Sequence, residues 1–208
     1  MMDEPDPTTA APDLDALYSP PAELIGKAIT HHLTDFHLDY LQVATFFCLA
    51  TGSETGLDAS PRGGPPGFVH ALDRKRIAFA DWPGNNRIES MRNIERDDRV
   101  AMLFIFPGLE IFLRINGRSA ISIDPELLAQ VGEGARIPKS AIVVTVEEVI
   151  FHCGRAVNRA RFWEAESRID KRSLPSAGQM MIALGQLADV EVEELDAHYD
   201  HGMKTDLY

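Results

Sequence analysis

The sequence predicts a mainly β protein of the α+β class, in which strands form a β-barrel and helices lie at its periphery. About six short segments are rich in β-branched and aromatic residues, and they are not separated by the regular helices that a doubly wound sheet requires. The clearest of them, LEIFLRINGRSAISI, alternates like a long strand. Phe112, Arg114 and Asn116 share one face of it, and the opposite face is apolar.

The remaining elements follow from local patterns. In chain order we expect one or two helices within 21–43, strands at 44–53, 58–64, 67–73 and 76–81, a loop at 82–86, a helix at 88–98, strands at 99–107 and 109–123, a helix at 124–132, a strand at 141–156, and helical segments at 157–167 and 176–187 before an acidic tail. Asp124 caps the 124–132 helix, with Pro125 at its first position.

Length and composition predict a flexible N-terminal segment, residues 1–20, followed by one domain at 21–208. The first twenty residues contain several prolines and few apolar side chains, so they bury too little surface to fold by themselves. The 208-residue length suits a single barrel domain with added helices.

Charge and cysteine content narrow the partners and the compartment. The formal net charge of −12 opposes binding to a phosphodiester backbone, so nucleic acid is not an expected partner. The two cysteines, Cys48 and Cys153, make no disulfide framework. The acidic start MMDEPDP does not resemble a signal peptide, and no apolar run reaches transmembrane length. These features predict a cytoplasmic protein that does not enter a membrane.

The first group of residues suited to binding an anion is Ser60 with Arg62. They lie two apart, so on a strand both face the same side, and a hydroxyl beside a guanidinium suits phosphate oxygens. The alternative is an arginine that covers the turn at Gly63 and Gly64.

A second group lies at the junction between the 82–86 loop and the following helix. It comprises Asn85, Asn86, Arg87 and Ser90, with Ser90 one turn beyond Arg87. A helix start also offers free N–H groups to an anion. The alternative is an asparagine-capped helix with an exposed arginine. Together, the two groups predict a phosphate site.

Other polar residues have less decisive patterns. Arg114 and Asn116 point away from an apolar strand face. A buried arginine needs an anionic or acceptor partner. A flavin ring or a phosphate could be that partner, and the alternative is an ion pair with an acid such as Glu110. His152 and Cys153 suggest metal or thiol chemistry, but there is no C-x-x-C motif, and we expect no metal site. No spacing forces a catalytic acid and base together, so the catalytic residues stay unknown.

Four segments, taken together and in order, carry a family resemblance. They are FFCLATGSETGLDASPRGGPPGFVH, DWPGNNRIESMRNIERDDRVAMLFIFPG, LRINGRS and FHCGRA, spread over residues 22–200. The chain resembles the pyridoxamine 5′-phosphate oxidase-like family of FMN-binding split barrels, and within it a branch of FMN-dependent enzymes of unassigned substrate. This resemblance implies a six-stranded antiparallel split β-barrel and a homodimer with one FMN in each of two clefts at the subunit interface.

The resemblance also implies roles for individual residues. Phosphate contacts correspond to Ser60, Arg62, Asn86, Arg87 and Ser90. Arg114 and Asn116 lie where the barrel strand approaches the flavin, and His152, Cys153 and Arg155 line the same cleft.

This sequence departs from the family's pattern at two positions of the site. Arg155 stands where many relatives have lysine, and Gly64 where an acid is common. The family's C-terminal Arg-Leu-x-Pro segment is replaced by DAHYDHGMKTDLY, so vitamin B6 oxidation is not the expected activity.

The function implied is FMN-dependent oxidation or reduction of an unidentified small molecule, with NAD(P)H as an electron donor to be tested. The flavin would carry the redox chemistry, and the protein would hold it. Three alternatives stay open: a flavin-binding protein without turnover, a haem-binding or haem-degrading split barrel with His152 or His198 as axial ligand, and a deazaflavin-using protein.

Overall fold

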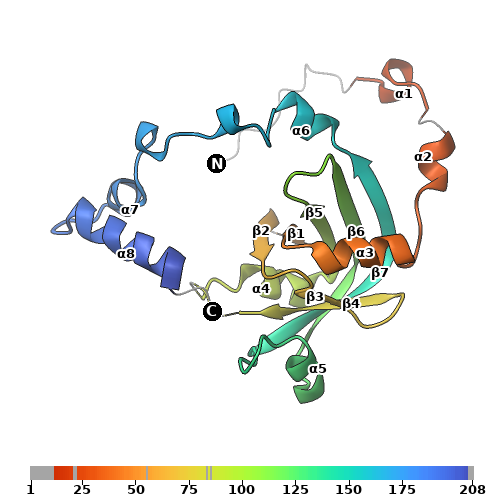
Figure 1. Ribbon diagram of the computed structural model, residues 1–208, viewed down its shortest axis with the longest axis horizontal. Coiled ribbons are helices and arrows are strands. Elements are labelled where there is room, and N and C mark those ends of the chain that lie inside the picture. Colours follow the sequence, from red (N-terminus) through yellow and green to blue (C-terminus); the bar gives the residue numbers. More distant parts are fainter. Residues whose placement is uncertain (1–11, 21–22, 55, 83, 85, 206–208) are drawn as a thin grey trace.

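One curved antiparallel sheet forms the centre of the molecule in the computed structural model, which describes residues 12–20, 23–54, 56–82, 84 and 86–205. Its seven strands follow the order β2-β1-β5-β6-β7-β4-β3 (Figure 1). Their bounds are β1 Phe46–Ser53, β2 Gly56–Gly63, β3 Val69–Ala71, β4 Arg76–Asp81, β5 Arg99–Ile105, β6 Ile111–Ser122 and β7 Ser140–Cys153. The expected fold class is confirmed, and the short edge strand β3 makes the sheet seven-stranded where six strands were implied.

The inner face of the sheet carries the main core. Residues paired across an antiparallel ladder share a face, and the pairs Phe47↔Phe104 and Phe104↔Leu113 are fully or almost fully buried. The neighbouring register positions Cys48, Leu103 and Arg114 therefore belong to the outer face, where side chains are more exposed. This alternation in β6 agrees with the pattern expected from the sequence.

The longest strand pair, β6 with β7, contains an irregularity that bends the sheet. The register shifts between Asn116 and Gly117, as at a β-bulge. At Gly117 the chains approach so closely that a Cβ atom would lie 2.1 Å from the carbonyl oxygen of Thr145. A bulge increases local twist and curvature. Such bending helps the two edges of the sheet to approach one another.

Helices cover parts of both faces. Their bounds are α1 Leu14–Leu17, α2 Glu23–Lys27, α3 Asp35–Val43, α4 Glu89–Arg96, α5 Pro125–Gln130, α6 Arg155–Arg159, α7 Ala177–Gly185 and α8 Val192–Thr205, with 3₁₀ turns at Ala165–Ser167 and Lys171–Ser173. Helix α4 packs against β1, β2 and β6 and buries Ile94 in the inner core. Helix α5 covers the outer face near β4 and β7, where Leu128 and Val131 meet Ala78 and Ala141.

Most expected helices are present, and two terminal regions differ. Asp124 caps α5 and Pro125 begins it, as the sequence predicts. The acidic tail, however, contains α8, whose Leu195, Tyr199 and Met203 repeat every four residues. Within the segment expected to be flexible, one helical turn, α1, buries no side chain, and residues 1–11 lie outside the described residues.

In the described part of the chain, no helix combines the length and apolarity needed to cross a bilayer.

The start of α3 predicts a pH-dependent stability. The Thr34 backbone N–H donates to Nδ1 of His37 at 3.0 Å, and burial lowers the pKa of His37 below 6.5. The unfolded chain then binds more protons than the folded chain as the pH falls through about 6.5, so stability decreases below that value. We expect thermal melts to show a loss of about 1 kcal/mol when this cap is broken by protonation.

The control for this prediction replaces the titrating ring by an amide. His37→Gln keeps an acceptor at the capping-box position and should flatten the melting temperature between pH 7.5 and 5. His70 and His152 also have lowered pKa values because of burial, so part of the slope will remain. An unchanged slope in His37→Gln would contradict the assignment.

Candidate functional site

A cleft lies at the split in the barrel, where β2 faces the end of β4. These strands are near opposite edges of the sheet, and no backbone ladder joins them. A side-chain bridge links them instead: Arg62 Nη1 donates to Asp81 Oδ1 at 3.0 Å. Both side chains are about one-fifth exposed. Arg62 is on the inner face because it pairs with the buried Phe47, and Asp81 is on the same face because it follows the buried Phe79 by two residues on β4. The split barrel therefore opens beside a half-buried arginine.

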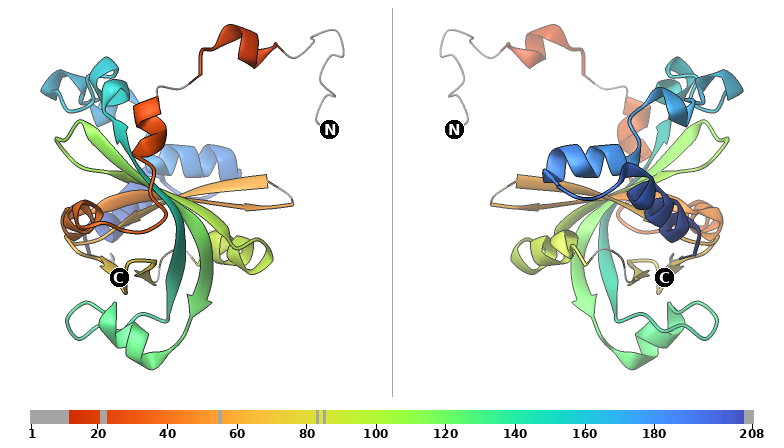
Figure 2. Two further views of the ribbon diagram at one scale, coloured as in Figure 1. Left: turned by 90° about the vertical axis from the view of Figure 1, so that its right-hand side faces the viewer. Right: turned by 90° about the vertical axis from the view of Figure 1, so that its left-hand side faces the viewer.

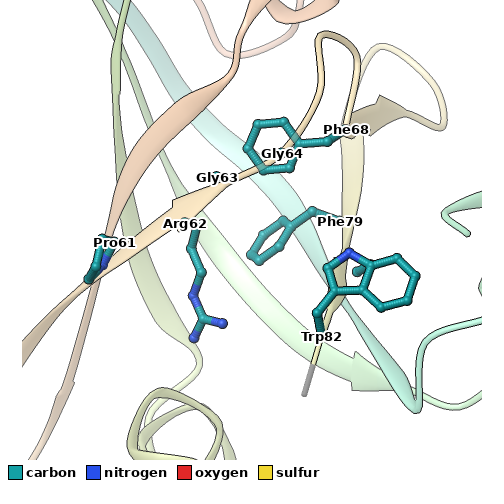
Figure 3. A pocket seen from close by; sticks show the side chains of 8 residues that line it. Pro61, Arg62, Gly63, Gly64, Phe68, Phe79 and Trp82 are labelled. Carbon is teal, nitrogen blue, oxygen red and sulfur yellow. The ribbon is translucent and has the colours of Figure 1, made fainter. Parts of the chain in front are cut away.

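One part of this cleft is lined mainly by apolar and aromatic side chains, and we call it the aromatic compartment. It has a volume of about 410 Å³ and is lined by Pro61, Arg62, Gly63, Gly64, Phe68, Phe79, Ala80 and Trp82. Figure 3 shows Arg62 and Trp82 on opposite sides, with Phe79 between them. A Cβ at Gly64 would lie 2.7 Å from the Phe68 ring, so glycine allows that ring to take its place.

The adjoining part is polar and shares Arg62 and Trp82 with the first, and we call it the polar compartment. It measures about 370 Å³ and is lined by Ser60, Arg62, Asp81, Trp82, Gly84, Asn86, Arg87, Ile88, Met91, Lys139 and Ser140. Three cationic residues, Arg62, Arg87 and Lys139, thus border one space from three separate segments. Two compartments of this size lie in the range that small-ligand pockets occupy.

The polar compartment has unused hydrogen-bonding capacity that suits an anion. The Nε atom of Arg62 is buried and has no hydrogen-bond partner among the described atoms. A buried unpaired donor is costly, and an anionic oxygen would satisfy it. Helix α4 begins at Glu89, and its N-cap, Ile88, supplies no side-chain acceptor to the first-turn N–H groups. The donors present therefore fit a phosphate group.

The structure brings together most of the predicted phosphate residues, with two differences in detail. Ser60, Arg62, Asn86 and Arg87 all line the polar compartment, and Asn86 takes a left-handed φ of 57°. Arg87 precedes α4, so it is not one helical turn from Ser90 as expected. Ser90 is 3% exposed, and its hydroxyl donates to Asp58 Oδ2 at 2.8 Å. Asn85 lies outside the described residues.

Arg114 and Asn116 lie on the opposite face of the sheet from this cleft. Arg114 Nη2 and Asn116 Nδ2 both donate to Glu148 Oε1 on β7, at 2.7 and 3.2 Å. The acid beside Arg114 is therefore Glu148 and not the Glu110 considered from the sequence, because β7 pairs with β6 in this register. The Nε atom of Arg114 and the Oδ1 atom of Asn116 remain buried without a partner among the described atoms.

Comparison with known proteins decides the family. The sequence model described as pyridoxamine 5′-phosphate oxidase matches residues 33–153, which span the sheet from the segment before α3 to the end of β7. The chain belongs to this family. No curated protein matches it in a sequence search.

Solved structures similar to this family member share a modest identity with it. HupZ from Group A Streptococcus is 19% identical, with a TM-score of 0.46 and coverage of 56% of this chain and 91% of its own. A pyridoxinephosphate oxidase family protein from Clostridium acetobutylicum is 11% identical (TM-score 0.43; 56% and 84% covered). A structure titled F420 reductase is 20% identical (TM-score 0.42; 58% and 98% covered).

In this pyridoxamine 5′-phosphate oxidase family member, the residues at the end of β7 and at the start of α6 do not line the described compartments. His152 is on the outer face, and burial together with nearby Arg114 lowers its pKa. Cys153 is exposed, and hydrogen bonding from the Arg155 backbone lowers the thiol pKa. Arg155 is exposed at the start of α6. Among the described residues, no three His, Cys, Asp or Glu side chains gather as a metal-binding group.

Sequence reasoning did not identify several residues that build the cleft. Asp81 follows Phe79 by two on a predicted strand, so alternation could have placed it on the inner face. Lys139 comes from the loop before β7, and nothing in its local sequence indicates the cleft. Phe68 reaches the aromatic compartment after the turn at Pro65–Gly67, which also depends on tertiary contacts.

Proposed function

We propose that this protein is an FMN-dependent oxidoreductase that acts on a small molecule and works as a homodimer. The observation that carries this proposal is the junction of the two compartments at Arg62, where a cationic space adjoins an aromatic one. FMN has the same two-part chemistry, a dianionic phosphate joined through a polyol chain to a flat aromatic ring. Family membership supports a flavin, and the site residues favour one that carries a terminal phosphate.

Arg62, Arg87 and Lys139 would hold the phosphate through charge-assisted contacts, with the first-turn N–H groups of α4 nearby. Phe68, Phe79 and Trp82 would exclude water from the adjacent part of the cofactor. When bound, FMN supplies hydride transfer at N5, chemistry that belongs to the cofactor. The side chains orient it and neutralise the charge of its phosphate.

The outer-face residues supply the argument for two chains. Arg114 and Asn116 present a buried donor, Nε, and a buried acceptor, Oδ1, which suit the edge of a flavin pyrimidine ring. The sheet separates them from Arg62 and Arg87, so one chain does not bring both sets to one flavin. A second chain would solve this problem, with the phosphate held by one protomer and the ring edge by the outer face of its partner.

Ligand binding by the purified full-length protein tests this proposal. We expect a flavin absorption spectrum and about one FMN per chain after release and mass spectrometry. Titration of the stripped protein should show FMN binding at least about 10²-fold tighter than riboflavin, because riboflavin lacks the phosphate that two or more charge-assisted contacts would hold. Equal affinity for the two flavins would refute the phosphate assignment.

The same samples separate the alternatives. Haem binding would give a Soret band, and it would require an axial ligand; His152 lies on the outer face and His198 in α8, so neither lines the described cleft. Deazaflavin use would appear as retention of F420 in preference to FMN. Stopped-flow reduction by NADH and NADPH then distinguishes an oxidoreductase from a flavin carrier, which would bind FMN without accelerating its reduction.

A further inference from the structure

The C-terminal arm, residues 160–205, leaves the barrel after α6 and ends in two helices that lie away from the sheet. Figure 1 shows it passing from α6 to the α7–α8 pair, which lies to the left of β1, β2 and β5 in that view. In the right-hand view of Figure 2, α7 and α8 lie in front of the strands of the barrel. The main contacts of these two helices are with one another.

The helix pair has a defined structure of its own. The backbone N–H of Gly178 donates to Asp196 Oδ1 at 2.7 Å, and Ser176 caps α7 by accepting from the backbone of Gln179. A Cβ at Gly178 would lie 2.6 Å from the carbonyl oxygen of Val192, so the helices touch at backbone distance there. The arm therefore presents a preformed surface.

That surface includes an apolar stripe. Leu184, which is 85% exposed, lies four residues after Met180 and three after Met181 on α7, so both methionines neighbour it on one face of the helix. Tyr199 and Met203 form a similar exposed pair on α8. Within α7, only Gly178 is buried, and α8 buries no side chain. This many exposed large apolar side chains on two short helices are typical of an interaction surface.

The same chain leaves a second surface open, on the outer face of the sheet. Phe46 and Leu103 are more than one-third exposed there, although both belong to central strands. Arg114 Nε and Asn116 Oδ1, which are buried without a partner in the described part of the chain, belong to side chains on this face too. Helix α5 covers the outer face only near β4 and β7.

A single chain exposes more surface than a compact monomer of its mass, as expected if part of that surface contacts another chain. The whole chain, with the residues outside the described ranges counted, exposes 15065 Å² of surface at a mass of 23.0 kDa. A compact monomer of this mass exposes about 9,600 Å². Helices α1 and α2, which bury no side chain, share in this excess. A standard protein interface needs about 800 Å² from each partner, which is a small part of the difference.

We propose that the α7–α8 pair of each chain packs against the barrel of a second copy, so that two arms clasp a two-fold dimer. The arm and the open sheet face both expose large apolar side chains, and in one chain the two surfaces are held apart. Two copies related by a two-fold axis can cover both surfaces reciprocally. This inference rests on the homodimer of the proposed function and adds the segment that holds it together.

Photo-crosslinking of the full-length protein tests the clasp directly. A photoreactive phenylalanine analogue at position 184 is incorporated, and unlabelled and ¹⁵N-labelled protein are mixed before irradiation. We expect crosslinked peptides that join the arm of one isotope to the barrel of the other. Crosslinks restricted to a single chain, or a sample that remains monomeric, would overturn the proposal.

Two variants with a matched control locate the contacts. Leu184→Asp on the arm and Leu103→Asp on the outer sheet face should each raise the dimer dissociation constant at least about 10²-fold in sedimentation experiments, because each change is made twice in a symmetric dimer. Ile123→Asp, at a 75% exposed site at the end of β6 before α5, should leave the dissociation constant unchanged.

FMN content is measured on the same samples, so the two proposals can fail separately. A dimer that Leu103→Asp weakens and Leu184→Asp does not would overturn the clasp and leave the flavin site standing. A dimer that responds to both variants but never holds FMN would support the clasp and refute the cofactor assignment. Circular dichroism confirms that each variant is folded.

Discussion

We expect the double variant Arg62→Ala, Arg87→Ala to lose during purification almost all of the FMN that the proposed site would retain. Both guanidinium groups line the polar compartment, and the buried Nε of Arg62 has no hydrogen-bond partner among the described atoms. Each charge-assisted contact is worth about 1.5–3 kcal/mol. Loss of two therefore weakens FMN binding by about 10²- to 10⁴-fold. Fluorescence titration of the stripped protein measures the change.

Two matched variants show whether the effect is local. Arg118→Ala also removes an arginine from two ion pairs, with Asp98 and Glu147, but it does not line the described compartments, so FMN affinity should not change. Arg62→Lys keeps a cation beside Asp81 but loses the planar guanidinium, and we expect an intermediate affinity. Retention of one FMN per chain by the double variant would show that the phosphate lies elsewhere.

Gly117→Ala will destabilise the fold by about 3 kcal/mol or more. The new Cβ would lie 2.1 Å from the Thr145 carbonyl oxygen and 3.2 Å from Val144 Cγ1. One of these neighbours is backbone in the partner strand, so relief requires β6 and β7 to separate at the bulge, and such overpacking is costly. For a chain of this size, the melting temperature should fall by roughly 6–12 °C.

A second glycine provides the comparison. Gly202 is in the interior of α8, and apart from its chain neighbours and the helix's own backbone, no described atom lies within 4 Å of a Cβ built there. Gly202→Ala should therefore cost nothing and could gain about 0.5–1 kcal/mol of local helix stability. If Gly117→Ala melts at the wild-type temperature, the close approach of the two strands at the bulge is not a feature of the protein in solution.

The sequence by itself determined most of the helices and strands and which side of a strand faces the core. Alternation in LEIFLRINGRSAISI placed Arg114 and Asn116 opposite the core, and Asp124 with Pro125 marked the start of α5. The predicted phosphate residues Ser60, Arg62 and Arg87 do line one cleft. These results depend on short-range rules, namely strand periodicity, helix capping and the chemistry of anion binding.

Only the tertiary structure decided which residues meet across the barrel. The Arg62–Asp81 bridge and the position of Lys139 depend on how the sheet curves until its edges approach, and no local pattern records that curvature. The same holds for Arg114, whose acid is Glu148 because β7 pairs with β6 in one particular register. It holds also for α7 and α8, whose apolar stripe could belong to a core by sequence and instead lies exposed beside the barrel. Periodicity states which face of an element is apolar, but the packing of distant segments selects the surface that covers it.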